Sequence, residues 1–165
     1  MPASCRFAFA VHVLAVLAYR DSQVSACSDA LAGSVNTNPV VIRRLLSQLR
    51  NAGLVKTQQG VRGGATLELP PEEITLGAVY RAVEPRPSFA ADRPEPNKGC
   101  PVGAGITRVL DEVFASAQAA LESALEERTL RDVMNAMKDE APPKRRMLPA
   151  SKAPAASGKV SGKAA

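Results

Sequence analysis

The segment Asn36-Thr-Asn-Pro-Val-Val-Ile-Arg-Arg-Leu-Leu-Ser-Gln-Leu-Arg-Asn-Ala-Gly53 carries signals for both ends of a helix. Asn38 is a favoured N-cap residue, and Pro39 suits the first helical position because the N–H group that proline lacks would have no helical partner there. Gly53 can adopt the left-handed conformation that ends a helix. The sequence therefore predicts a helix that begins after Asn38 and ends before Gly53.

The two sides of this helix differ in chemistry. Apolar residues recur at helical spacing and are expected to face a core. They are Ile42, Leu45, Leu46 and Leu49. The opposite side consists of Val40, Arg43, Arg44, Ser47 and Arg50. No acid of this helix accompanies the arginines, whereas a solvated helix usually mixes both charges for i,i+4 pairing. This pattern favours an anionic partner, and the alternative is an ordinary surface helix.

Two further helices are predicted upstream. Apolar spacing over residues 5–19 indicates an amphipathic first helix, with His12 off its apolar side. Ser25 can cap a short second helix that buries Ala26, Ala30 and Leu31, and Gly33 can end it. Two short helices joined by a tight turn, the later one capped and basic outside, are typical of a helix-turn-helix.

Downstream, the period changes from helical to alternating, so residues 54–69 are predicted to form a two-stranded ribbon. Gly60, Gly63 and Gly64 allow positive φ at its turn, and Arg62 is placed at the tip. A phosphate-cradling loop is the rival interpretation, but the spacing is not that of a Walker motif.

A fourth helix and a much longer one follow. Thr75 caps a helix whose apolar side includes Val79, and Pro85 ends it. After a proline-rich linker, residues 101–128 carry a broad apolar stripe at helical spacing. It includes Ile106, Leu110, Val113, Phe114, Ala117 and Leu121. A second copy of the chain is the simplest source of a helix to cover this stripe, and burial within one chain is the alternative.

Charge is distributed in three blocks over the 165 residues. Residues 1–64 carry a net charge of +5, residues 65–140 of −6 and residues 141–165 of +6. The last block has almost nothing to bury, so residues 139–165 are predicted to be a disordered basic tail. Weak attraction to polyanions would follow from its charge alone.

Cysteine content and hydropathy restrict the class of protein. Three cysteines without CxxC spacing, together with a single histidine, argue against a disulfide framework and against a metal site. The apolar run from Phe7 to Ala18 is too short to span a bilayer and has a poor signal-peptide context, so we expect a cytoplasmic protein without membrane partners.

The ordered set of motifs resembles the Rrf-two family of bacterial winged-helix transcription regulators. The matching segments cover about residues 4–135. They are Arg6-Phe-Ala, Asn38-Pro-Val-Val-Ile-Arg-Arg-Leu-Leu, Ala52-Gly-Leu-Val, Gly60 with Gly63-Gly64, and Ile74-Thr-Leu. Cys100-Pro-Val-Gly is similar to the branch of the family that carries no iron–sulfur cluster. Cluster-binding members present three cysteines before the long helix and this chain presents one, so we expect no cofactor.

The resemblance implies a mainly α fold with a small β-ribbon: a winged helix-turn-helix over residues 1–84, a linker over 85–99 and dimerisation helices over 100–138. It also implies a homodimer whose long helices cross, with two recognition helices in successive major grooves of double-stranded DNA. Groove chemistry then suggests base contacts from Arg43 or Arg44, phosphate contacts from Asn38, Ser47 and Arg50, and minor-groove insertion of Arg62. Our leading hypothesis is a repressor acting on a palindromic operator.

Two other classes of function compete with this one. An RNA-binding module would need aromatic stacking platforms, but the few aromatics fall in predicted cores. An enzyme with a Cys100 nucleophile would need a base, and no catalytic triad is visible. Cys100 is instead a candidate redox sensor, because a helix start and the nearby Lys98 favour its thiolate. The alternative is that Cys100 only fills space, with a small-molecule effector elsewhere.

Overall fold

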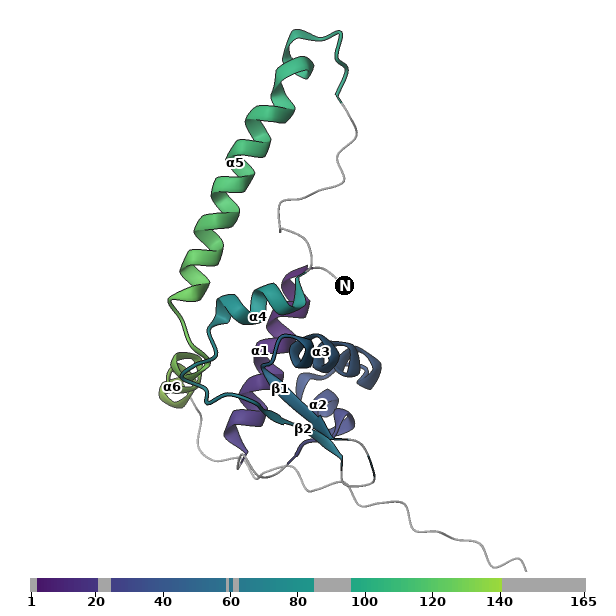
Figure 1. The fold of residues 1–165 in the computed structure, drawn as a ribbon, viewed down its shortest axis with the longest axis vertical. Coiled ribbons are helices and arrows are strands. Elements are labelled where there is room, and N and C mark those ends of the chain that lie inside the picture. Colours follow the sequence, from purple (N-terminus) through teal and green to yellow (C-terminus); the bar gives the residue numbers. More distant parts are fainter. Residues whose placement is uncertain (1–2, 21–24, 59, 61–62, 85–95, 141–165) are drawn as a thin grey trace, which may run out of the picture.

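The computed structural model describes residues 3–20, 25–58, 60, 63–84 and 96–140. Within these ranges the chain forms six helices and one two-stranded antiparallel sheet (Figure 1). In chain order they are α1 (Ala3–Tyr19), α2 (Ser28–Val35), α3 (Pro39–Asn51), β1 (Val55–Gln58), β2 (Gly64–Leu67), α4 (Leu76–Val83), α5 (Pro101–Glu126) and α6 (Leu130–Glu140). The mainly α fold with a small β-ribbon that the sequence predicts is confirmed.

The helix α3 has the limits and the buried side expected from its sequence. The Asn38 side chain accepts a hydrogen bond from the Val40 N–H group at 2.8 Å, and Gly53 has φ +73°. Ile42, Leu45, Leu46 and Leu49 are all buried. The cap, the proline and the terminal glycine therefore act locally as predicted, and the apolar side fixes how α3 sits on the core.

The core forms around α1, which packs against α2, α3, α4 and α6. Ala10, Val13 and Leu14 are fully buried, and Phe7 packs partly buried at the edge with its ring 5.8 Å from that of Tyr80. The buried part of α1 is thus wider than one amphipathic stripe, because neighbours cover it from several sides. At one end, Arg6 pairs with the buried Glu84 at 2.8 Å and joins α1 to the end of α4.

The second helix begins and ends later than predicted. Cys27, not Ser25, is its N-cap residue, and Gly33 lies inside the helix. The helix ends where Asn36 adopts a left-handed conformation with φ 57°. Asn tolerates this conformation better than most residues, so the turn to α3 needs no glycine.

Ala26 forms an isolated bridge to β2 and is not part of α2. Its backbone pairs with that of Ala65, with N···O distances of 3.0 and 2.9 Å in the two directions. A Cβ atom on Gly64 would lie 2.7 Å from the Ala26 carbonyl oxygen, so glycine is needed there for close approach of the backbones. Gly60 has the positive φ expected at the turn, but Gly64 does not.

Helix α5 begins away from the compact head formed by α1–α4 and the sheet, and its C-terminal end returns to that head, where α6 follows. Figure 1 shows α5 rising away from the other helices, with only its C-terminal part beside α4. At the base of α5, the Leu76 N–H group donates to the Arg128 carbonyl and the Leu130 N–H group to the Ile74 carbonyl, each at 2.8 Å. Leu130 then enters the core of the head, so α6 ties the long helix to the head.

Candidate nucleic-acid interface

The outward side of α3 is the candidate interface. Val40, Arg43, Arg44, Ser47 and Arg50 are all exposed, as predicted from the period of the helix. Val40 is 49% exposed although it is apolar, which is unusual beside three buried leucines and a buried isoleucine on one helix. Three guanidinium groups and one methyl-rich side chain therefore share one surface.

Asn38 contributes to this surface while it caps the helix. Its Oδ1 atom is used by the Val40 N–H group, so the amide NH₂ group is the part that can donate to an anion. The positive end of the α3 helix dipole lies at the same place and favours negative charge, while the Val40 and Val41 N–H groups are already hydrogen-bonded to Asn38. The start of α3 is therefore suited to a phosphate.

Arg43 is in contact with α2. Its Nε–H group donates to Ser28 Oγ at 3.3 Å, and Nη2 lies 3.8 Å from Asp29 Oδ1. The sequence of α3 contains no acid and does not predict this carboxylate, because the neighbouring helix provides it. Asp29 in the first turn of α2 is the signal that could have indicated it.

Arg50 and Arg44 differ in their surroundings. Arg50 Nη1 donates to Thr57 Oγ1 of β1 at 3.4 Å, which links the end of α3 to the ribbon. Arg44 has no hydrogen bond or ion pair with any residue that the structure describes. The Arg44 guanidinium is therefore less restricted in conformation than those of Arg43 and Arg50.

The ribbon β1–β2 lies beside α3 and forms the wing. Its register pairs Val55 with Leu67 and Gln58 with Gly64, and the Gly63 N–H group donates to the Gly60 carbonyl at 2.8 Å in the turn. Arg62, predicted at the tip, lies outside the described residues.

The apolar stripe of α5 is open in the single chain. No residue of α5 is buried, and Ile106, Val109 and Val113 are 37, 47 and 54% exposed. Leu110, Phe114, Ala117 and Leu121 are only partly covered. The predicted dimerisation residues thus share one long helix whose apolar side is incompletely packed by its own chain.

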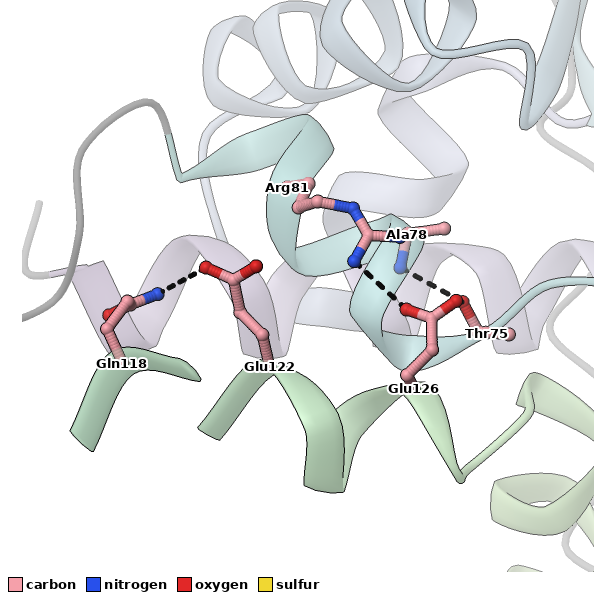
Figure 2. Close-up of polar contacts among 6 residues, drawn as sticks. All are labelled: Thr75, Ala78, Arg81, Gln118, Glu122 and Glu126. Atoms are coloured by element: carbon pink, nitrogen blue, oxygen red, sulfur yellow. Dashed lines mark hydrogen bonds and ion pairs between the residues drawn. The ribbon is translucent and has the colours of Figure 1, made fainter. Parts of the chain in front are cut away.

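The base of α5 is joined to α4 by polar contacts (Figure 2). Glu126 accepts a hydrogen bond from Thr75 Oγ1 at 3.1 Å and pairs with Arg81 at 3.0 Å. Gln118 donates to the Tyr80 hydroxyl oxygen at 3.2 Å and to Glu122 at 2.8 Å. Hydrogen bonds from Arg81 and Thr75 lower the pKa of Glu126, and the Arg81 charge acts in the same direction. These contacts fix the angle at which the C-terminal end of α5 meets the head.

Cys100 is exposed at the N-cap position of α5. The N–H groups of Gly103 and Val102 lower the pKa of its thiol, although the sulfur does not form a capping hydrogen bond of good geometry. The predicted lowering of the pKa is therefore present, with the helix start as its cause. Cys5 and Cys27 lie on other elements and are partly buried.

None of the helices in the described ranges combines the length and apolar character of a membrane span. In the same ranges, no three His, Cys, Asp or Glu side chains come together as a group that could hold a metal ion.

Comparison with known proteins gives consistent results. The model of the Rrf2 family, described as an iron-dependent transcriptional regulator, matches residues 3–136. YwnA of Bacillus subtilis, named as a candidate HTH-type transcriptional regulator, is 44% identical over 130 residues, which are 79% of this chain and 95% of YwnA. A crystal structure of a candidate DNA-binding protein is 41% identical with a TM-score of 0.63, covering 79% of this chain and 99% of that one.

A more distant structure shares the fold alone. The oxidized form of Staphylococcus aureus CymR has a TM-score of 0.58 at 23% identity, over 81% of this chain and 96% of CymR.

The iron in the family description does not match the residues described here. Cys5, Cys27 and Cys100 lie on α1, before α2 and before α5, and no other ligand-type side chains gather around them. An iron–sulfur cluster is usually held by about four thiolate-type ligands, which this donor set does not provide.

Proposed function

The chain belongs to the Rrf2 family of transcriptional regulators, and from this premise we propose that it is a homodimeric repressor that binds a palindromic operator. Its relatives are named as regulators of transcription, and the winged-helix fold agrees with DNA binding. A cytoplasmic location follows from the proposal, since that is where bacterial DNA lies.

The exposed side of α3 is the observation that carries this proposal. A helix can enter the major groove only if one side presents base-reading and phosphate-binding groups without obstruction. On α3 that side combines Arg43, Arg44 and Arg50 with the exposed Val40, while its opposite side is locked in the core. Shape and charge are thus both suited to a duplex.

Each residue of the candidate interface has a proposed contact. Arg43 or Arg44 would donate to a guanine edge, and Val40 would meet an apolar group in the same groove. Asn38, Ser47 and Arg50 would contact phosphates, for which their donor groups are suitable. Arg62, Gly60, Gly63 and Gly64 would form a wing that reaches the adjacent minor groove.

Dimerisation through α5 would supply a second recognition helix, which would bind the second half-site of the operator. Covering the stripe with the same stripe of a second chain gives an isologous contact, which implies a two-fold axis. Two recognition helices related by that axis would read half-sites about 34–36 Å apart, one helical turn of DNA. In this scheme residues 1–84 form the DNA-binding unit, 85–99 the linker and 100–138 the dimerisation unit.

Cys100 is proposed as the input for a thiol signal. Hydrogen peroxide would oxidise two Cys100 thiols of a dimer to one disulfide, with two molecules of water as the other product. The exposed position of Cys100 and its lowered pKa support this role. Because Cys100 begins the dimer helix, a disulfide there would alter how the two heads are held relative to each other.

Selection from random double-stranded DNA tests the proposed function directly. The expected result is a short inverted repeat, bound by the dimer and lost steeply as salt rises. Single-stranded RNA of the same base composition should not compete. Failure to enrich any duplex sequence, or preference for the RNA, would refute the proposal.

A further inference from the structure

We propose that Ser28 and Asp29 of α2 are positioning residues that orient Arg43 for reading a guanine, and that Arg44 is the phosphate-binding member of the arginine pair. This inference rests on the proposed DNA-binding function and specifies which residue reads a base. It follows from which atoms of each guanidinium are in contact with the protein.

A guanidinium group has two edges that can each form a pair of hydrogen bonds. In Arg43, Nε donates to Ser28 Oγ at 3.3 Å and Nη2 lies 3.8 Å from Asp29 Oδ1, so both contacts use the side edge. Nη1, which with the outer N–H group of Nη2 forms the end edge, makes no hydrogen bond or ion pair with a described residue. A donor pair of this kind matches O6 and N7 of guanine in the major groove.

The contact between Arg43 and Asp29 is not explained by a contribution to folding stability. The Arg43 and Asp29 side chains are 58 and 68% exposed, and an ion pair so open to solvent contributes little to folding. Its effect is to restrict the conformations of a long side chain before DNA arrives. Ordering such a side chain on binding costs about 2- to 12-fold in affinity, which preorganisation recovers.

The Asp29 carboxylate also lowers the affinity of the surface for DNA. A contact with Arg43 that had no function would not compensate for this loss. Asp29 is a negative charge beside a surface that is proposed to meet phosphates, so it repels every duplex regardless of sequence. A residue that lowers general affinity while orienting one donor pair raises the ratio of specific to nonspecific binding. Ser28 and Asp29 are therefore specificity-determining, and neither needs to touch the operator.

Arg44 provides the contrast within the same helix. No described residue orients its guanidinium, and it follows Arg43 by one position, about 100° around the helix. A mobile cation suits a phosphate, which accepts hydrogen bonds from many directions, better than a base edge, which requires one plane. Arg43 thus reads a base, and Arg44 binds a phosphate.

The test measures guanine discrimination on the selected operator. Each guanine in turn is replaced by 7-deazaguanine, which removes the N7 acceptor, and affinity is compared for wild type, Arg43→Ala, Arg44→Ala and the double variant Ser28→Ala, Asp29→Asn. For wild type, one guanine per half-site should show a penalty of about tenfold. Arg43→Ala should abolish that penalty, and Arg44→Ala should retain it while weakening binding to all duplexes.

The double variant distinguishes positioning from a purely structural role. It should reduce the 7-deazaguanine penalty to about threefold or less while its affinity for unrelated duplex stays equal or rises. Ser28→Thr keeps a hydroxyl and should keep the penalty. Glu127→Gln, which removes an exposed carboxylate at the junction of α5 and α6, is the matched control and should leave the penalty unchanged.

Three results would overturn the inference. They are a full penalty in the double variant, a penalty that disappears in Arg44→Ala but not in Arg43→Ala, and the absence of any sensitive guanine in an operator that is bound tightly. If the double variant does not fold, Ser28→Ala alone gives the same measurement. Failure of the wild type to select any duplex would instead refute the proposed function itself.

Discussion

The helices α3 and α5 share a design at their N-termini and differ in how their apolar sides are covered. Each begins with proline after a cap residue, Asn38 for α3 and Cys100 for α5. The apolar side of α3 is packed by its own chain to 7% exposure or less. No residue of α5 is buried, and Val113 is 54% exposed.

This difference indicates two kinds of partner. Once its apolar side is buried, α3 presents arginines, which attract a polyanion. The stripe on α5 presents valine, isoleucine and leucine, which gain most by burial against a similar surface. One helix would thus bind nucleic acid, and the other would bind a second copy of the chain.

Replacing Val113 by Asp should have the largest effect on this comparison. In a dimer the change would bury one carboxylate from each protomer, and an uncompensated buried charge costs about 3–5 kcal/mol. We expect monomers in light scattering at micromolar concentration, with an intact helical circular dichroism spectrum, and the corresponding Leu121→Asp variant should behave alike.

Ala115→Asp is the control for that experiment. It adds the same charge two positions along α5, about 200° around the helix and away from the stripe. The wild-type mass should be retained. A wild type that is monomeric at this concentration, or a Val113→Asp dimer, would remove the assignment of α5 as the dimer helix.

The double variant Arg43→Ala, Arg44→Ala should have the next largest effect. Loss of one base contact costs about 1–3 kcal/mol and loss of a phosphate contact less, so operator affinity should fall by more than tenfold. The dependence of affinity on salt should also become shallower. Arg108→Ala on α5, whose partner is Glu112 on the same helix, is the control and should bind as wild type does. Wild-type affinity in a folded double variant would show that α3 is not the recognition helix.

Local signals in the sequence were sufficient for α3. The cap, Pro39 and Gly53 each act within a few residues of their own position, and the period of Ile42 to Leu49 reports the direction of the core. Thr75 is another such case, since its hydroxyl accepts from the Ala78 N–H group at 3.0 Å as a cap residue should. Caps and helix ends that form within one helical turn can therefore be predicted from the sequence without knowledge of the tertiary structure.

Errors arose where distant segments determine the local structure. The sequence around Ala26 predicts a helix, because nothing near it indicates a pairing with Ala65, about forty residues away. The turn position of Gly64 predicts a positive φ, but glycine is required there by the close approach of the Ala26 backbone. Asp29 cannot be assigned to the arginine surface from local sequence, because an acid on α2 joins that surface only after the helices pack.

Gly77→Ala tests whether the C-terminal end of α5 is packed by its own chain. The apolar stripe at Ile106 and Val113 is not packed in this way. A Cβ atom on Gly77 would overlap the Glu126 carboxylate and lie 3.2 Å from the Glu126 backbone nitrogen. The helix must shift or lose its contacts with Arg81 and Thr75, so unfolding in urea should show a loss of about 1–3 kcal/mol.

The matched substitution is Gly33→Ala in α2. Nothing lies within 4 Å of the added Cβ atom, and alanine is favoured over glycine inside a helix by about 0.5–1 kcal/mol. Stability should therefore rise. Equal effects of the two substitutions would contradict close packing of α4 on α5.

The smallest expected effect concerns Cys100, the cap residue that distinguishes α5 from α3. The nearby N–H groups of Gly103 and Val102 lower the pKa of its thiol in the folded chain, so the thiolate forms at lower pH than in the unfolded chain. This preference for the folded state is fully present above the unfolded pKa and is lost as pH falls through the folded pKa. Alkylation of Cys100 by iodoacetamide, followed by mass spectrometry, should reach half its maximal rate at lower pH in buffer than in urea.

The redox role of Cys100 adds a second measurement, in which mild peroxide changes the operator affinity of wild type and leaves Cys100→Ser unaffected. Coincident alkylation profiles would show that the start of α5 does not activate the thiol, and equal responses of the two proteins to peroxide would leave the signal to another part of the molecule.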